Sequence, residues 1–226
     1  MLDTPRIKKI YQEIQRSIYY MIPEKWDHLY LYASITEKVY KIPIGEMFFY
    51  YFPKGILKKR PVNVYEIPGK FNIDEEIYMK LVRDLYQSIQ KLREEYVKKD
   101  QRLWSSLTIS IENNQFKVIY NYDSENNWNY SNDDRKVIWK YKYLGIDTAA
   151  LDRKEKSIVK RYIKDSQYQQ EDEEEYTEMM YKKPIHKNIL DYDKPDNPVE
   201  QNVIKKLEEQ HRKVNNQILS GIDFRD

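Results

Sequence analysis

The sequence predicts an α+β fold: an antiparallel sheet of about five strands with helices mainly on one face, plus a helical C-terminal extension. Three observations support this fold class. Two long segments, 4–22 and 72–96, place apolar residues at helical spacing, as in helices that bury one face. Short segments between and after them alternate apolar and polar residues, as strands do. After about residue 153 the chain becomes richer in charged residues and proline.

The first helix has readable ends. Thr4 can cap it, Pro5 suits the first helical position, and Pro23 ends it. One face carries an apolar stripe of Ile7, Ile10, Ile14, Ile18 and Met21.

The second helix is the strongest in the sequence. Asn72 is the predicted cap, with Glu75 three residues later as its partner in a capping box. The polar residues of this helix lie on other faces than the apolar stripe, so one side of the helix should be exposed to solvent. The stripe consists of Ile77, Leu81, Leu85, Ile89, Leu92 and Tyr96.

Strands are predicted at 29–35, at 47–52 and, more weakly, at 62–67, which Pro68-Gly69 closes. A hairpin follows, with strands at 106–111 and 116–122 and a tight turn at Asn113-Asn114. The polar alternates of its first strand predict that one hairpin face meets helices and the other meets water. These alternates are Ser106, Thr108 and Ser110.

The rest of the chain is predicted to be helical between irregular segments. A polar loop at 123–131 leads to a short helix that Gly145 can cap. A helical stretch from Leu151, a linker punctuated by prolines and an amphipathic helix at 199–218 follow. The narrow stripe of this last helix suits docking on the core or on a partner. We divide the chain into a domain at 1–152 and a charged helical extension at 153–226.

Composition and motifs point away from an enzyme. The chain has 39 basic and 37 acidic residues, so no global field attracts nucleic acid or an anionic membrane. It has no cysteine, its three histidines lie far apart, and its five glycines form no phosphate-binding loop. We therefore expect no catalytic, cofactor-binding or metal site, and no cofactor. Without a secretory signal or a long apolar run, a cytoplasmic protein with no membrane partner is expected.

Two charged segments each have a plain and a sharper interpretation. The basic segment from Lys54 to Arg60 follows aromatic residues, a combination that can bind single strands, but solubility explains it more simply. We expect no direct nucleic-acid binding. The acidic run at 171–175 is either a solvated segment or an imitation of phosphate charge that occupies the basic groove of a nuclease.

Several segments, in order, resemble the YezG-like immunity proteins over residues 7–146. They are Ile10–Ile14, Met21–Trp26, Leu29–Ala33, Phe71–Asp74, Leu92–Glu95, Trp104–Thr108 and Arg135–Gly145. This family includes EsaG-type antitoxins, which bind and inhibit nuclease toxins exported by type VII secretion. The shared motifs look like fold determinants, so we expect Trp26, Trp104 and Trp139 to be largely buried. The basic segment at 54–60 and the long tail after about 155 depart from the family pattern.

The resemblance implies an immunity protein that inhibits a secreted nuclease toxin by stoichiometric binding. The alternative is a cytoplasmic adaptor or chaperone that escorts a secretion substrate without inhibiting it. Binding residues often lie in irregular segments, so the candidates come from the polar loop, its edges and the acidic run. The rival interpretation is a solvated loop whose Trp128 folds onto the core. The candidates are Asp123, Glu125, Trp128, Tyr130, Asp133, Asp134, Glu171, Asp172, Glu173, Glu174 and Glu175.

Overall fold

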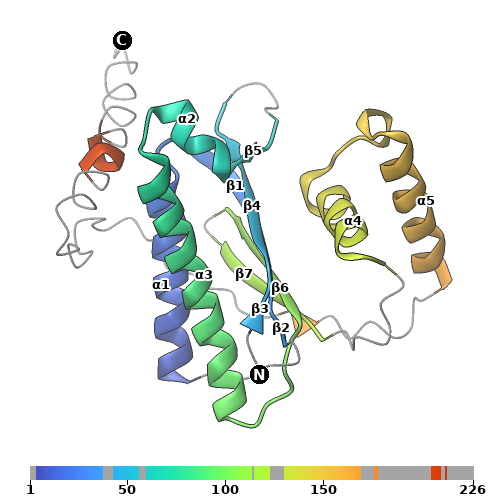
Figure 1. Cartoon of the computed structure of the whole chain (residues 1–226), viewed down its shortest axis with the longest axis horizontal. Helices are drawn as coiled ribbons and strands as arrows, with labels where there is room; N and C mark the ends of the chain where they lie inside the picture. The colour runs from blue at the N-terminus through green and yellow to red at the C-terminus, as the bar shows by residue number, and fades with distance from the viewer. Residues whose placement is uncertain are drawn as a thin grey trace, which may run out of the picture.

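An antiparallel sheet with the strand order β5-β4-β1-β6-β7-β8 separates two layers of helices (Figure 1). The computed structural model describes residues 4–37, 43–55, 60–113, 115–122, 130–168, 176–177, 205–209 and 212. The sheet strands are β1 (Trp26–Ser34), β4 (Met47–Pro53), β5 (Val62–Asn63), β6 (Ser106–Glu112), β7 (Gln115–Asn121) and β8 (Tyr176–Thr177). A separate pair consists of β2 (Thr36–Glu37) and β3 (Pro43–Ile44). The predicted α+β class with an antiparallel sheet is confirmed.

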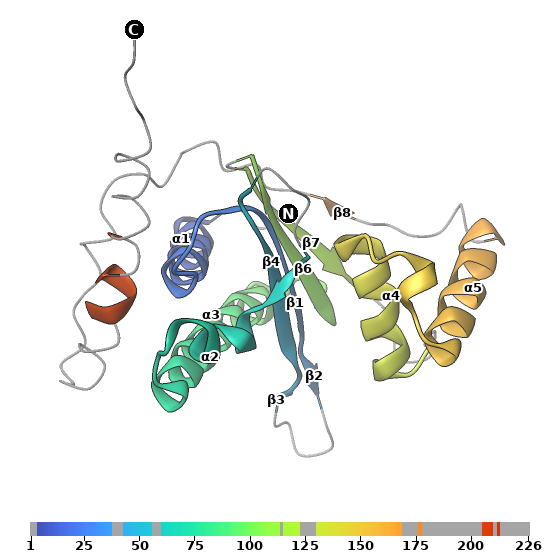
Figure 2. The same cartoon turned by 90° about the horizontal axis from the view of Figure 1, so that it is seen from above.

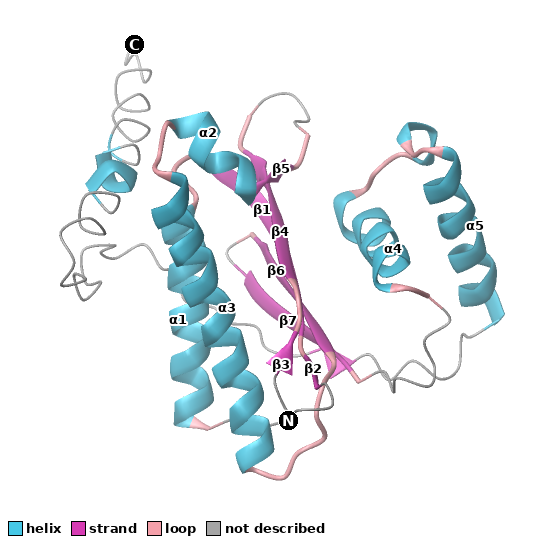
Figure 3. Cartoon of the chain, in the orientation of Figure 1, coloured by secondary structure: helices cyan, strands magenta, loops and turns pink. Residues whose placement is uncertain are grey.

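The helices α1 (Pro5–Met21), α2 (Ile67–Phe71) and α3 (Glu75–Lys98) lie on one face of the sheet, while α4 (Asn132–Leu144) and α5 (Arg153–Tyr168) lie on the other (Figure 2). Short 3-10 turns occur at Val64–Glu66 and Thr148–Ala150. Figure 3 shows the two long helices running side by side along the sheet. The main core lies between them and the sheet.

This core follows from the alternation of the strands. In β1 the side chains of Leu29, Leu31 and Ala33 are buried, and in β6 those of Leu107, Ile109 and Ile111 are buried on the same face. The predicted stripe of α1 meets them, and all five of its members are buried. Each leucine, isoleucine or methionine side chain removed from water in this way contributes on the order of 1.5–3 kcal/mol.

The start of α1 is confirmed, and that of α3 is corrected. Thr4 Oγ1 accepts a hydrogen bond from the backbone N–H of Ile7 at 3.2 Å, as predicted. In α3, however, Asp74 is the cap and accepts from the N–H of Ile77 at 3.0 Å. Asn72 instead ends α2 with a positive φ of 51°, a conformation that asparagine tolerates. The predicted capping box at Asn72 is therefore wrong.

The strand predicted at 62–67 is wrong beyond Asn63. The side chain of Asn63 accepts a hydrogen bond from the N–H of Tyr65 at 3.2 Å and begins a 3-10 turn. Such a local side-chain bond competes with strand pairing. Pro68 then occupies the first turn of α2, where a missing N–H costs nothing.

The strands β6 and β7 form the predicted hairpin, and Asn113 has the positive φ expected of a tight turn, 48°; the other predicted turn residue, Asn114, lies outside the described residues. Its second face does not meet water as predicted. Ser106, Thr108 and Ser110 are only 8%, 7% and 8% exposed. Aromatic residues of β1 and β4 and the indole of Trp139 on α4 surround this face. The second helical layer thus buries positions that read as solvent-facing in the sequence.

Of the three tryptophans expected to be buried, Trp104 and Trp139 are, and Trp26 is half-buried against the core. Leu207, in the described part of the predicted last helix, is fully buried in the main core. Docking of this helix on the core is thus seen at one residue. Among the described helices, none is long and apolar enough to cross a membrane.

Candidate partner-binding surface

Polar contacts between the start of α4 and the end of α5 hold these two helices together; we call them the α4–α5 clasp. The Tyr130 hydroxyl donates to Asp165 Oδ2 at 2.6 Å, and the Arg161 guanidinium lies over the Tyr130 ring at 4.4 Å. Arg161 also pairs with Asp134 at 3.1 Å. From inside α4, Arg135 donates two bonds to the Tyr130 carbonyl oxygen, each of 3.2 Å.

The start of α4 is fixed by its own capping box. The N–H of Asp134 donates to Ser131 Oγ at 3.2 Å, and the N–H of Ser131 donates to Asp134 Oδ2 at 3.3 Å. Asp134 therefore serves both the helix cap and the ion pair. Burial, and then the nearby Asp165 carboxylate, raise the pKa of Tyr130 to about 12. The hydroxyl thus stays a donor at neutral pH.

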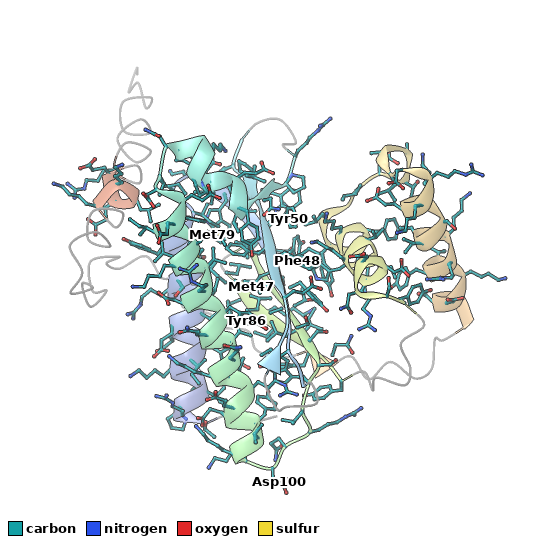
Figure 4. The ribbon with its side chains drawn as sticks, in the orientation of Figure 1. Met47, Phe48, Tyr50, Met79, Tyr86 and Asp100 are labelled. Atoms are coloured by element: carbon teal, nitrogen blue, oxygen red, sulfur yellow. The ribbon has the colours of Figure 1, made fainter. Side chains whose placement is uncertain are left out.

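An aromatic layer joins α4 to the sheet. Trp139 Nε1 donates to Thr108 Oγ1 at 3.0 Å, and its ring meets that of Phe48 edge-on, with centroids 5.0 Å apart. The Lys136 amine lies 5.1 Å from the centre of the Phe48 ring, and that of Lys140 lies 5.7 Å from that of Tyr50. Figure 4 shows Phe48 and Tyr50 on the side of β4 that faces α4.

The lower-numbered end of β1 carries a half-buried group of rings that we call the aromatic rim: His28, Tyr30, Phe52 and Tyr143. His28 stacks on Phe52 with ring centroids 4.1 Å apart, and Tyr30 lies 5.6 Å from Tyr143. The Tyr30 hydroxyl donates to Glu112 Oε1 at 2.6 Å, which fixes its ring. Rigid, partly exposed aromatic groups of this kind often anchor protein interfaces.

The structure separates the predicted binding residues into three groups. Tyr130 and Asp134 belong to the α4–α5 clasp, so both have structural roles. Asp133 is exposed in the first turn of α4. The other candidates lie outside the described residues: Asp123, Glu125, Trp128, Glu171, Asp172, Glu173, Glu174 and Glu175.

Sequence reasoning missed Arg161, Asp165 and the aromatic rim. The clasp joins residues 27 and 35 positions apart, so no local pattern reveals it. The sequence of β1 does indicate the aromatic rim. Tyr30 and Tyr32 occupy the alternate positions of this strand, where polar residues would mark a solvated face. Within the described residues, no three potential ligands among His, Asp and Glu come together for a metal.

Comparison with known proteins shows where the chain belongs. The profile of the family described as "Immunity protein YezG-like" matches residues 7–160. An "Immunity protein YezG" of Bacillus spizizenii is 36% identical over 146 residues, which cover 64% of this chain and 86% of that protein.

The matches to two further relatives extend over almost the full length of each relative. An "Immunity protein YezG" of Bacillus subtilis is 27% identical over 158 residues, or 70% of this chain and 99% of that protein. A "Type VII secretion system protein EsaG" of Staphylococcus aureus is 30% identical over 164 residues, or 71% of this chain and 95% of that protein. The matched region spans every strand of the sheet except β8, almost all of α1, the helices α2 to α4 and the first half of α5, and the chain belongs to the YezG-like family of immunity proteins.

Proposed function

We propose that this protein binds a secreted toxin with nuclease activity and inhibits it stoichiometrically, without catalysing a reaction itself. The observation that carries the proposal is the family match over residues 7–160. The name of the EsaG relative, a type VII secretion system protein, supports a toxin exported by that route. The inhibitor would act in the cytoplasm, where a toxin is held before export or arrives from a neighbouring cell.

Inhibition by binding requires a rigid surface that excludes water and matches the partner. The aromatic rim supplies ordered rings, since Tyr30 is fixed by Glu112 and His28 by stacking on Phe52. Truncation of buried interface aromatics often costs 2 kcal/mol or more, on the order of a 30-fold loss of affinity. We assign the rim and the exposed Asp133 to the toxin-binding surface.

Co-expression with the C-terminal domain of a candidate toxin tests the proposal. A stable complex that no longer cleaves DNA or RNA is the expected result. As a control, the complex is denatured, and the toxin is separated and refolded alone. Its nuclease activity should then return. Titration should reach full inhibition at a fixed molar ratio, because a stoichiometric inhibitor does not turn over.

The adaptor alternative gives a different result in the same experiment. An escort would bind the targeting region of the full-length toxin and leave its nuclease activity intact, so the full-length toxin is co-expressed alongside the isolated C-terminal domain. Failure to bind any toxin domain would contradict both functions.

A further inference from the structure

The side of α5 that points away from α4 carries exposed cations. Ile158 and Val159 are buried on the inner side of the helix. Arg153, Lys160 and Lys164 are exposed, and at about 100° per residue they fall within about 40° of one another around the axis. They span about 16 Å along the helix. We call these three residues the α5 cationic face; Ile163, 37% exposed, lies at its edge.

The acidic side chains of α5 are engaged elsewhere. Glu155 accepts from the N–H of Asp152 at 3.1 Å at the start of the helix. Asp165 accepts from the Tyr130 hydroxyl at 2.6 Å in the α4–α5 clasp. Both carboxylates are half-buried, whereas the three cations are exposed. The outer side of the helix therefore presents charge of a single sign.

This arrangement weakens the helix by itself. Within the α5 cationic face, Lys160 and Lys164 lie at i,i+4 spacing, where side chains of like charge repel each other and destabilise a helix. Solubility does not require such repetition. On the outer side of α3, exposed residues of both signs are interspersed, with Arg83 beside Asp84 and Lys91 near Glu94. A single-sign face is instead suited to attracting an oppositely charged partner.

We propose that the α5 cationic face docks against an acidic surface of the toxin, an inference that rests on the proposed function. Ile163 adds apolar contact beside the charges. A protein surface is the more suitable partner because nucleic-acid-binding domains are usually strongly basic. This chain has a formal net charge of only +2, and the face contributes only three cations. The contact would thus complement carboxylates of the toxin, whereas imitation of its polyanionic substrate would require acidic residues at the contact.

Charge reversal with a matched control tests this docking. The first variant is Arg153→Glu, Lys160→Glu and Lys164→Glu. The control is Arg16→Glu, Arg83→Glu and Lys91→Glu, which reverses three exposed cations on α1 and α3 and changes the net charge equally. Glutamate and lysine have similar helix propensities, so both variants should fold, which circular dichroism and thermal melting verify.

The rates of association with the toxin domain are measured at low and high salt. Because steering by complementary charge accelerates encounter, the α5 variant should associate at least about 10-fold more slowly at low salt and lose most of its salt dependence. The control variant should stay within about twofold of the wild type. Equal slowing of both variants would show a nonspecific effect of net charge and overturn the proposal.

Other outcomes separate this inference from the proposed function. If the wild type inhibits the toxin and the α5 variant binds it equally well, the docking is wrong while the immunity function stands. If the wild type binds no toxin, both fall. Loss of binding to a DNA duplex with unchanged toxin binding would assign the face to nucleic acid. The last outcome concerns the acidic run at 171–175 of the same chain. If replacing these acids by amides lowers the melting temperature, and the α5 reversal leaves toxin binding unchanged, the α5 cationic face binds this run and the docking on the toxin is overturned.

Discussion

The indole Nε1 of Trp139 donates a hydrogen bond to Thr108 Oγ1 at 3.0 Å, and both residues are buried. This bond connects α4 to β6 across the second face of the sheet. It explains how a polar position in a strand can lie under a helix without an unsatisfied group, since each partner supplies what the other needs. The contact therefore combines apolar burial with a specific orientation of α4.

Thr108→Val should destabilise the protein by about 1–3 kcal/mol, because the buried indole N–H then has no acceptor. Thr108→Ser keeps the hydroxyl and loses only a methyl group, so it should cost about 0.8 kcal/mol or less. Urea denaturation of both variants measures the difference. Equal losses of stability for valine and serine would contradict a role for the hydrogen bond.

Neighbouring aspartates at the start of α4 should behave differently. Asp134→Ala removes the bond to the Ser131 N–H and the ion pair with Arg161, so the free energy of unfolding should fall by about 1–2 kcal/mol. Asp133→Ala should change it by about 0.5 kcal/mol or less. If Asp133 contacts the toxin as proposed, its replacement should lower affinity without lowering stability, measured by calorimetric titration and denaturation in parallel.

Two glycines offer an opposite pair of predictions. A Cβ at Gly45 would overlap the Ser34 carbonyl oxygen and the Tyr86 hydroxyl, so Gly45→Ala should destabilise by about 1–3 kcal/mol. Gly69 lies within α2, and a Cβ there meets nothing within 4 Å. Gly69→Ala should therefore stabilise by about 0.5–1 kcal/mol. Thermal melting distinguishes them, and a melting temperature unchanged by Gly45→Ala would show that β4 can shift to make room.

Alkaline pH should weaken the protein partly through Tyr86. Its hydroxyl donates to the Ser34 carbonyl oxygen at 2.8 Å, and burial, with the Glu46 carboxylate, raises its pKa to about 12. The ordinary value in an unfolded chain is about 10. The folded state thus favours the neutral form, so this stabilisation is complete below about pH 10 and is lost between about pH 10 and 12.

Tyr86→Phe tests this contribution because phenylalanine has no proton to lose. Urea denaturation from about pH 9 to 12 should show a smaller decline in stability for the variant than for the wild type in that window. Parallel declines would mean that Tyr86 does not contribute to the alkaline transition.

The sequence predicts those helices and strands whose positions are set by neighbouring residues, such as helix caps and alternating apolar positions. Thr4 and Pro5 mark the start of α1 because capping involves only adjacent residues. The same reasoning failed at Asn72, where α2 ends directly before α3 begins and the asparagine serves the earlier helix. The buried serines of β6 could not be foreseen, because α4 covers them from a later part of the sequence.

The candidate surface was predictable only in part for a related reason. Acidic and aromatic residues that share an irregular segment point to Tyr130, Asp133 and Asp134 as binding residues. The pairing of Tyr130 with Asp165 depends on how α5 folds back on α4, which no spacing in either helix reveals. The division of the chain at about residue 152 stays a prediction.

Leu207 has a consequence for the order in which the protein can mature. Its side chain is fully buried in the core that the residues of α1 begin to build. More than two hundred residues must therefore be synthesised before that core is complete. Until then, the apolar surface that Leu207 covers remains exposed. A chain cut short before this residue would lack the side chain that covers this part of the core, and the apolar surface left exposed would be a target for chaperones and quality-control proteases.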